Sequence, residues 1–185
     1  MDKGIQVSDD LIQPMEMGKI FMESGMFPDI KTQAMAVVKI LAGREIGLSP
    51  FESMNALYIV NGKLSLTSNA MATIVKKTGK YDYKIEKLDE QECTITFLKG
   101  EVELGKSTFT FKDGAKAGLV NKPVWQSYPK NMLFARALSN GVRWFCPDAC
   151  CGYYTTEEAQ DFTDVTPVKT KTITMNDKDV TNGEV

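Results

Sequence analysis

The chain has 185 residues, a formal net charge of −2 and no histidine. Apolar residues make up 43% of it and charged residues 25%, which is typical of a globular protein with one core of ordinary size. No run approaches the roughly 18 apolar residues that a membrane-spanning helix needs, and residues 1–14 lack the basic and apolar pattern of a secretory signal. We therefore expect one folded domain over residues 1–162, in the reducing cytoplasm and without membrane contacts.

The lack of histidine removes the commonest general base and the commonest metal ligand. It excludes nucleophilic catalysis by Ser-His or Cys-His pairs. The four cysteines are poorly spaced for a disulfide framework or for paired zinc ligands, so reduced thiols are expected. A zinc site built from all four stays open as an alternative, beside a role as small buried side chains. These residues are Cys93, Cys146, Cys150 and Cys151.

Two helices are expected near the N-terminus, over residues 14–24 and 30–46. Pro14 would stand in the first turn of the first helix, where a missing N–H is tolerated. Apolar residues recur at helical spacing in the second segment, with Asp29 as its expected N-cap and Gly47 as its expected stop.

A break at residues 49–50 precedes an expected β-hairpin over residues 56–66. The Asn61–Gly62 pair indicates this hairpin, because both central positions of such a tight turn take positive φ angles. A further helix is expected to be capped by Thr67 or Ser68 and to end near Gly79.

Three strands are expected over residues 81–88, 92–98 and 103–111, in the order of an antiparallel meander. Apolar residues and threonines alternate in the second and third strands, as a sheet with one buried face requires. The side chains expected on the buried face are those of Ile95, Phe97, Phe109 and Phe111.

Two more helices are expected over residues 113–119 and 129–145. Pro129 in the first turn and Pro147 beyond the last stand where helix geometry tolerates proline. These elements predict an α+β fold: a small antiparallel three-stranded sheet plus a β-hairpin, packed with a long C-terminal helix and N-terminal helices. Residues 163–185 contain many threonines and no aromatic residue, so a disordered C-terminal tail is expected there.

Basic residues are concentrated in two parts of the sequence. Residues 106–146 hold seven basic residues and the single acid Asp113, a local charge of +6. Residues 63–87 hold six lysines and two acids, a local charge of +4. We expect cations from both parts to converge in the folded protein as a trough that binds the phosphates of a polynucleotide.

The helix predicted over residues 129–145 has two distinct faces on a helical wheel. Its apolar stripe consists of Phe134, Leu138, Val142 and Phe145. Its opposite face consists of Met132, Arg136, Ser139 and Arg143, with the arginines about 10.5 Å apart along the axis. Neither arginine has an acid three or four residues away, so we expect both to point outward as a row that binds phosphates. The alternative is a merely solvated outer face.

Trp125 and Tyr128 come just before this helix, next to Lys122 and Lys130. Aromatic rings beside cations are the two parts of a single-strand platform, in which bases stack on the rings while the cations follow the backbone. For Trp125, a place in the hydrophobic core is the alternative.

Three stretches carry a resemblance to a known family: GREIGLSPFESMNALYIVNGKLSLTSNAM (residues 43–71), WQSYPKNMLFARALSNGVRWFCPD (125–148) and GYYTTEEA (152–159). They resemble the RecT-like single-strand annealing proteins of bacteriophages, the RecT/Redβ superfamily, over roughly residues 40–160. The most specific parts are IVNGKLSLTSNAM and the pattern W-x-x-YP-x-x-M-x-x-AR.

The resemblance implies a sheet and a long helix that assemble into rings or helical filaments, with single-stranded DNA in a continuous basic groove. It implies a phage recombinase of the bacterial cytoplasm that binds single-stranded DNA and anneals complementary strands without ATP. The first strand would be held by its phosphates, and the annealed duplex would be a bound intermediate. No catalytic residue and no cofactor would be needed, with Mg²⁺ only as a counterion of the DNA. A host single-strand binding protein or a phage exonuclease would be further partners.

In the better-known RecT branch, the long helix carries an aromatic residue, a methionine, and then consecutive lysines and an arginine that contact the DNA backbone. Tyr128 and Met132 match this pattern, but Phe134 and Ala135 replace the lysine pair, which leaves the two arginines as the expected contacts. We expect alanine at either arginine to weaken DNA binding uniformly over sequence, and loss of residues 163–185 to leave it unchanged. The residues expected to bind DNA are Lys63, Lys76, Lys80, Lys112, Lys116, Lys122, Trp125, Tyr128, Lys130, Arg136, Ser139 and Arg143.

Three other functions stay open at this point. The first is a single-stranded DNA-binding protein of phage replication that does not anneal strands. The second is a metal-dependent nuclease, whose carboxylates would have to meet in space although the predicted elements scatter them. Those carboxylates are Asp82, Glu86, Asp113 and Asp148. The third is an adaptor whose basic segments bind an acidic protein.

Overall fold

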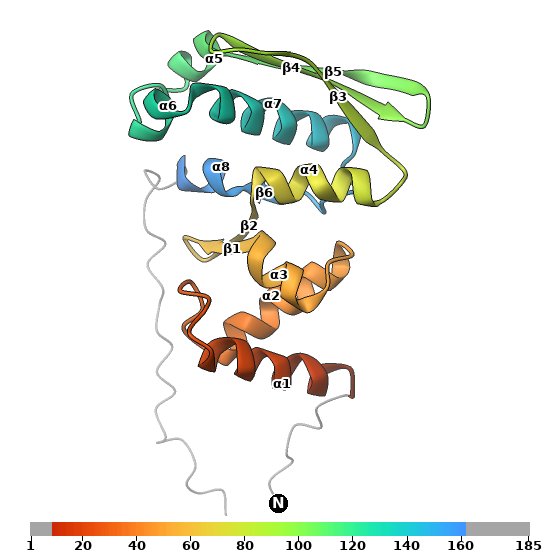
Figure 1. Cartoon of the computed structure of the whole chain (residues 1–185), viewed down its shortest axis with the longest axis vertical. Coiled ribbons are helices and arrows are strands. Elements are labelled where there is room, and N and C mark those ends of the chain that lie inside the picture. Colours follow the sequence, from red (N-terminus) through yellow and green to blue (C-terminus); the bar gives the residue numbers. More distant parts are fainter. Residues whose placement is uncertain (1–8, 162–185) are drawn as a thin grey trace, which may run out of the picture.

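The computed structural model describes residues 9–161, which form helices α1–α8 and strands β1–β6 (Figure 1). In chain order they are α1 (Asp9–Glu23), α2 (Gln33–Glu45), α3 (Pro50–Ala56), β1 (Leu57–Val60), β2 (Lys63–Leu66), α4 (Ser68–Lys77), β3 (Asp82–Leu88), β4 (Glu92–Lys99), β5 (Val102–Thr110), α5 (Phe111–Lys116), α6 (Pro123–Ser127), α7 (Pro129–Phe145), β6 (Tyr154–Thr155) and α8 (Thr156–Asp161). The α+β fold is as predicted. The tail predicted over residues 163–185 lies outside the described residues.

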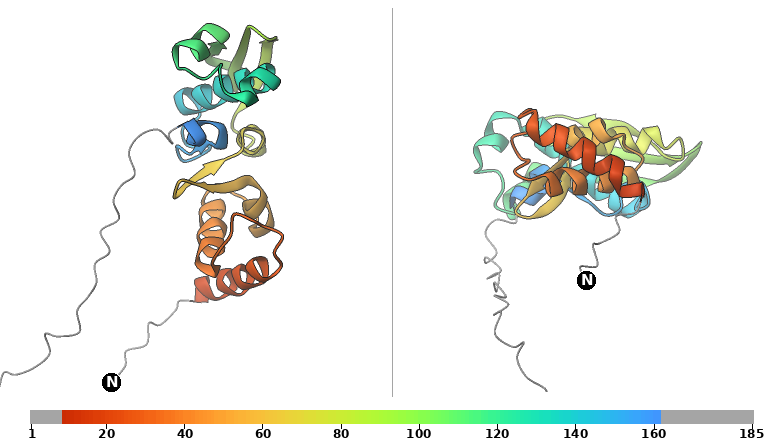
Figure 2. Two further views of the ribbon diagram at one scale, coloured as in Figure 1. Left: turned by 90° about the vertical axis from the view of Figure 1, so that its left-hand side faces the viewer. Right: turned by 90° about the horizontal axis from the view of Figure 1, so that it is seen from below.

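The elements are stacked in layers along the long axis of the molecule (Figures 1 and 2). The antiparallel sheet β3-β4-β5 lies at one end, with α7 packed beneath it. α4 and α8 form the next layer, the hairpin β1-β2 follows, and α1–α3 form the other end. The hairpin belongs to a second sheet, because the short strand β6 pairs with β2 in parallel orientation. This strand and the helices α3, α6 and α8 were not expected.

The alternation of β4 and β5 is as predicted, with one exception. Ile95 and Phe97 are 0% exposed, and the register places Phe109 on the same face. Phe111 does not belong to the strand, because the side chain of Thr110 caps α5 and so ends β5. The helix predicted over residues 113–119 therefore begins at Phe111.

Two glycines allow α7 and this sheet to approach closely. A methyl group at Gly141 of α7 would lie 2.0 Å from the ring of Phe97. A methyl group at Gly105 of β5 would lie 2.5 Å from the ring of Phe145. Since no carbon atom fits at those distances, glycine is required on both sides of the contact.

The hairpin and the helix after it form as predicted. Asn61 and Gly62 take φ angles of 52° and 74° in the turn between β1 and β2. Thr67 caps α4 by accepting a hydrogen bond from the N–H of Ala70 at 3.1 Å. Before the hairpin, α3 replaces the predicted break, and Ser49 and Glu52 close a capping box at its start.

The N-terminal helices differ from the prediction at their starts. α1 begins at Asp9, so Pro14 lies inside the helix instead of in its first turn. Thr32 caps α2, and Asp29, the predicted cap, accepts a hydrogen bond from Lys39 at 2.9 Å. The reason is burial: the side chain of Lys39 is 0% exposed, and a buried ammonium group requires a charged partner.

The described residues contain two hydrophobic clusters. The larger one fills the space between the sheet, α7, α4 and the hairpin. The smaller one lies within the layer of α1–α3. Lys39 connects the smaller cluster to the hairpin, since it donates a hydrogen bond to the carbonyl of Met54 at 2.9 Å and its Nζ lies 5.3 Å from the ring centre of Tyr58 in β1.

Candidate nucleic-acid interface

The long helix α7 is covered on both of its faces. Its apolar stripe packs on the sheet as predicted, with Leu138 and Val142 buried. The opposite face carries Met132 at 5% exposure and Ser139 at 0%, because α4, β6 and α8 pack there. The prediction of an outward-facing row on α7 is therefore wrong.

Arg143 and Glu158 form a bidentate ion pair on this covered face. Nη1 of Arg143 donates to Oε2 of Glu158 at 2.9 Å, and Nη2 donates to Oε1 at 2.7 Å. Oε1 also accepts from the hydroxyl of Ser139 at 2.8 Å, and Oε2 accepts from the N–H of Thr155 at 3.0 Å. The Glu158 side chain is only 3% exposed. Four donors thus hold this carboxylate where solvent barely reaches it.

Arg136 lies at the edge of the same cluster, with Nη1 at 3.8 Å from Oε1 of Glu158. Burial lowers the pKa of Arg136, and the hydrogen bond to Glu158 raises the pKa of Arg143. Burial by itself would raise the pKa of Glu158, but hydrogen bonds from Arg143 and from the Thr155 N–H outweigh it and keep that pKa below its ordinary value. The cluster is therefore an internal set of ion pairs at neutral pH.

The partner of the two arginines was missed because it comes from a distant part of the chain. Glu158 lies 15 residues beyond Arg143 and is brought back by β6 and α8. The sequence does contain a signal for α8, since Thr155 and Glu158 have the spacing of a capping box and form one in the structure. The spacing predicts the helix start, but only the tertiary structure shows which cations the carboxylate meets.

Lys76 and Lys80 also have carboxylate partners. Lys76 pairs with Asp82, and Lys80 pairs with Asp148. Their ammonium groups lie 4.6 Å and 5.0 Å from the ring centres of Tyr83 and Tyr81. Both lysines stand near the C-terminal end of α4, whereas α5 and α6 lie at the other side of the molecule (Figure 1). The predicted continuous trough of unpaired cations is therefore wrong for a single chain.

Trp125 is a core residue and not a stacking platform. It is 1% exposed, and its ring centre lies 6.2 Å from that of Phe109. α5 packs against it so closely that a methyl group at Gly114 would lie 3.0 Å from its ring. Tyr128, three residues on, is 61% exposed. Of the two predicted stacking residues, only Tyr128 presents its ring to solvent.

Exposed residues of α5 and of the start of α7, which α6 joins in the chain, make up a basic region that we call the basic corner. Its members are Lys112, Lys116, Tyr128 and Lys130, all exposed. Among residues 9–161, Lys112 and Lys130 have no carboxylate partner. Lys122 is half-buried between α5 and α6, and Lys63 is exposed on the separate hairpin.

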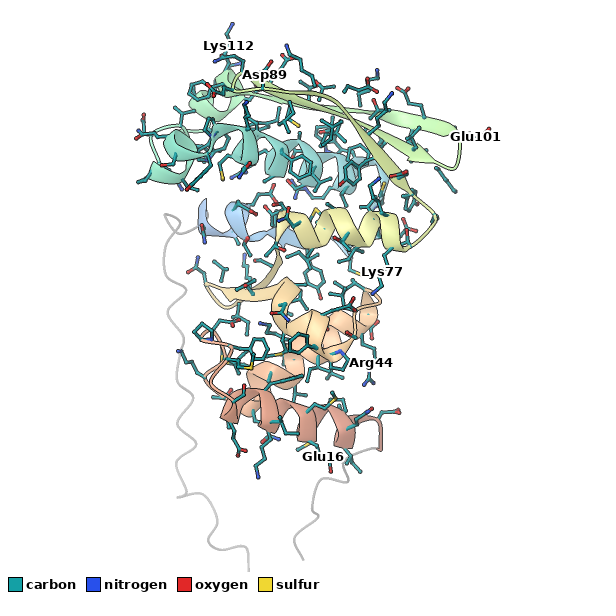
Figure 3. The ribbon with its side chains drawn as sticks, viewed as in Figure 1. Glu16, Arg44, Lys77, Asp89, Glu101 and Lys112 are labelled. Carbon is teal, nitrogen blue, oxygen red and sulfur yellow. The ribbon has the colours of Figure 1, made fainter. Side chains whose placement is uncertain are left out.

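Two acids in or beside this corner are already engaged. Asp113 belongs to α5 itself and accepts hydrogen bonds from the N–H and the hydroxyl of Thr110 at 3.0 and 2.6 Å. Figure 3 shows that Lys112 points away from the ribbon and that Asp89 lies beside it. Asp89 accepts hydrogen bonds from the N–H groups of Gln91 and Glu92 at 2.8 and 2.9 Å. It also lies 3.4 Å from the ammonium group of Lys87. The corner keeps a net positive charge, because Lys112, Lys116 and Lys130 outnumber Asp113, the single acid of residues 111–130.

A groove of about 490 Å³ lies between α4, β3, α7 and α8. Its lining combines apolar and polar side chains, and α8 contributes one carboxylate. The lining residues are Ser68, Asn69, Ile85, Leu88, Asn131, Met132, Phe134 and Glu157. Ile85 and Leu88 belong to the edge strand β3 and are 42% and 40% exposed. The groove thus offers apolar surface for flat ligand groups beside polar donors.

Metal-binding and nuclease residues do not gather in the structure. Free thiols occur at all four cysteines, and burial raises the pKa of Cys93 and Cys150 to about 12. No group of three or more residues suited to a metal ion occurs within residues 9–161. Each carboxylate considered for a nuclease has a different partner. Asp82 and Asp148 form ion pairs with Lys76 and Lys80. Glu86 and Asp113 accept hydrogen bonds from the hydroxyls of Thr96 and Thr110.

Family models, curated proteins and solved structures give no match to this chain. None of the helices described for residues 9–161 has the length and apolar character required to cross a membrane.

Proposed function

We propose that the protein binds single-stranded DNA through the basic corner and anneals complementary strands without a nucleotide cofactor. The observation that carries the proposal is the exposed ring of Tyr128, which lies in the sequence between the exposed lysines of α5 and Lys130. Single-strand platforms combine solvent-exposed rings with basic residues in this way. The resemblance to RecT-like proteins supports the annealing step and the assembly of many chains on one strand.

The start of α7 adds to the attraction for phosphates. This helix has 17 residues, and no side chain caps its first turn at Tyr128. Pro129 has no N–H group, so the N–H groups of Lys130 and Asn131 and the positive end of the helix dipole are the donors at this end of α7. Phosphates would bind there while bases stack on Tyr128 and leave their pairing edges to a second strand. Sequence would be recognised by base pairing alone.

Each chain contributes only a few phosphate contacts in this scheme. A ring or filament of chains would sum those contacts along the DNA, and counterion release would make the binding strong at low salt. Electron microscopy with and without single-stranded DNA tests this assembly. A single chain that stays monomeric on long DNA would contradict it.

The binding surface is tested with the triple variant Lys112→Ala, Lys116→Ala and Lys130→Ala. Fluorescence anisotropy with a labelled 30-nucleotide oligo(dT) should show at least about tenfold weaker binding. The slope of log affinity against log salt should fall by about 2, at roughly 0.7 per lost phosphate contact. The matched control is Lys19→Ala, Lys31→Ala and Arg44→Ala, which removes the same charge from α1, α2 and the segment between them. Figure 3 labels Arg44 of this set. Equal losses in both triple variants would contradict a local binding surface.

Annealing is tested with two complementary labelled oligonucleotides. The wild-type protein should speed duplex formation and remain bound to the product. A protein that binds the strands but slows their pairing would favour the non-annealing alternative.

A further inference from the structure

The two glutamates of α8 lie on donors that come from other helices. Glu158 accepts from Ser139 and Arg143 of α7. Glu157 accepts from the hydroxyl of Ser68, the first residue of α4, at 3.1 Å. Two consecutive carboxylates therefore cover a row of hydroxyl and guanidinium groups that spans α4 and α7.

The covered donors match the chemistry of a phosphodiester. A guanidinium fork that binds a carboxylate at 2.7 and 2.9 Å can bind two phosphate oxygens in the same way. Serine hydroxyls and the amino-terminal end of a helix are further common phosphate donors. The charges also balance, since Arg136 and Arg143 face Glu157 and Glu158. Without α8, this face of α7 would keep two positive charges.

The groove described above lies beside the covered donors, since Ser68 and Glu157 are among its lining residues. Asn131, which follows Lys130 of the basic corner, also lines it, together with Met132 and Phe134 of the same helix. In the proposed binding mode, a strand that enters at Tyr128 places its bases on these apolar side chains and its next phosphates where the two carboxylates now lie.

We infer that α8 is a displaceable strap whose two carboxylates occupy the phosphate positions of a bound nucleic-acid strand. This inference rests on the proposed function. The strap is short: α8 has six residues, and β6 pairs with β2 over only two positions. Because opening it leaves two partly buried arginines without carboxylates, it stays closed until phosphates replace them. Bound DNA would thus extend from the basic corner into the groove by exchange of one anion for another.

The test combines oligonucleotide binding with hydrogen exchange in the full-length protein. With 30-nucleotide oligo(dT) bound, amides of residues 154–160 should exchange faster, while those at the start of α7 become protected. Glu157→Gln should bind the oligonucleotide about fivefold more tightly, because one competing carboxylate is removed. The matched control Glu101→Gln, which removes a carboxylate from the turn between β4 and β5, should leave affinity unchanged (Figure 3).

The outcomes separate the strap from the proposed function. If the oligonucleotide binds but exchange in residues 154–160 stays constant or slows, and Glu157→Gln binds like Glu101→Gln, the strap is refuted and the binding surface stands. If neither the wild-type protein nor Glu157→Gln binds oligo(dT) at low salt, both proposals fail. Glu158→Gln serves as a second variant, expected to strengthen binding further if it remains folded.

Discussion

Arg143 binds both carboxylate oxygens of Glu158, at 2.7 and 2.9 Å, across 15 residues of sequence. This contact attaches the last described helix to the longest one and turns a face that looked like a DNA-binding row into an interior. The same carboxylate also accepts from Ser139 and from the N–H of Thr155. Glu158 should therefore affect the stability of the fold, the dependence of that stability on pH, and the exposure of this face of α7 to ligands.

Replacement of Glu158 by glutamine should destabilise the protein by about 3 kcal/mol, because the change removes a 3%-exposed carboxylate and leaves two partly buried guanidinium groups without a countercharge. Urea unfolding followed by circular dichroism measures this difference. Glu101→Gln, on the exposed turn of the sheet, should change the free energy of unfolding by less than about 0.5 kcal/mol. A variant at Glu158 as stable as the wild type would show that the ion pair does not form.

The contribution of Glu158 should disappear in acid. Its pKa is lowered in the folded protein, so the stabilisation is fully present above the ordinary glutamate pKa of about 4.3 and is lost as pH falls through the lower folded value. The stability difference between the wild type and Glu158→Gln should therefore be large at neutral pH and shrink below the ordinary pKa. Denaturation curves of both proteins at several pH values measure this difference. A difference in stability that grew as the pH fell would contradict the lowered pKa of Glu158.

Lysine should not replace Arg143 without loss. One ammonium group cannot make the two parallel hydrogen bonds to Glu158 and also reach Asn140, which Nη2 contacts at 2.8 Å. We expect Arg143→Lys to cost about 1–2 kcal/mol and Arg143→Ala to cost more. Because alanine at this position reduces stability, its DNA binding is informative only at temperatures where the variant is shown to be folded.

Gly141 should not tolerate alanine. Alanine favours a helix over glycine by about 1 kcal/mol, but its methyl group would lie 2.0 Å from the Phe97 ring, and overpacking of this kind costs about 1–3 kcal/mol or more. We expect a net loss in urea unfolding, partly restored by Phe97→Leu in the double variant. Asn131→Ala, at an exposed position of the same helix, is the control and should be near neutral.

Trp125 and Tyr128 should respond to alanine in opposite ways. Trp125→Ala removes a ring that is 1% exposed and should reduce stability by about 3–5 kcal/mol. Tyr128→Ala should leave the thermal midpoint nearly unchanged and weaken oligo(dT) binding about tenfold, within the range of one lost base-stacking contact. Thermal unfolding and anisotropy on the same samples separate the two effects. Unchanged affinity after the Tyr128 substitution would remove the main support for the basic corner.

The sequence by itself determined the local elements of this protein. The Asn61–Gly62 turn, the cap at Thr67 and the proline limits of α7 follow from backbone geometry that neighbouring residues impose. The alternation of β4 likewise predicted which side chains face inward. Short-range rules suffice there because each feature depends on a few consecutive residues.

Only the tertiary structure decided which charges meet. The lack of an acid near Arg136 and Arg143 in sequence was real, yet β6 and α8 bring Glu158 onto them, and Asp82 and Asp148 likewise pair with Lys76 and Lys80. Burial of Trp125 beside Phe109 was decided in the same way. The physical reason is that ion pairing and burial depend on distance in space, and chain folding makes that distance independent of separation along the sequence.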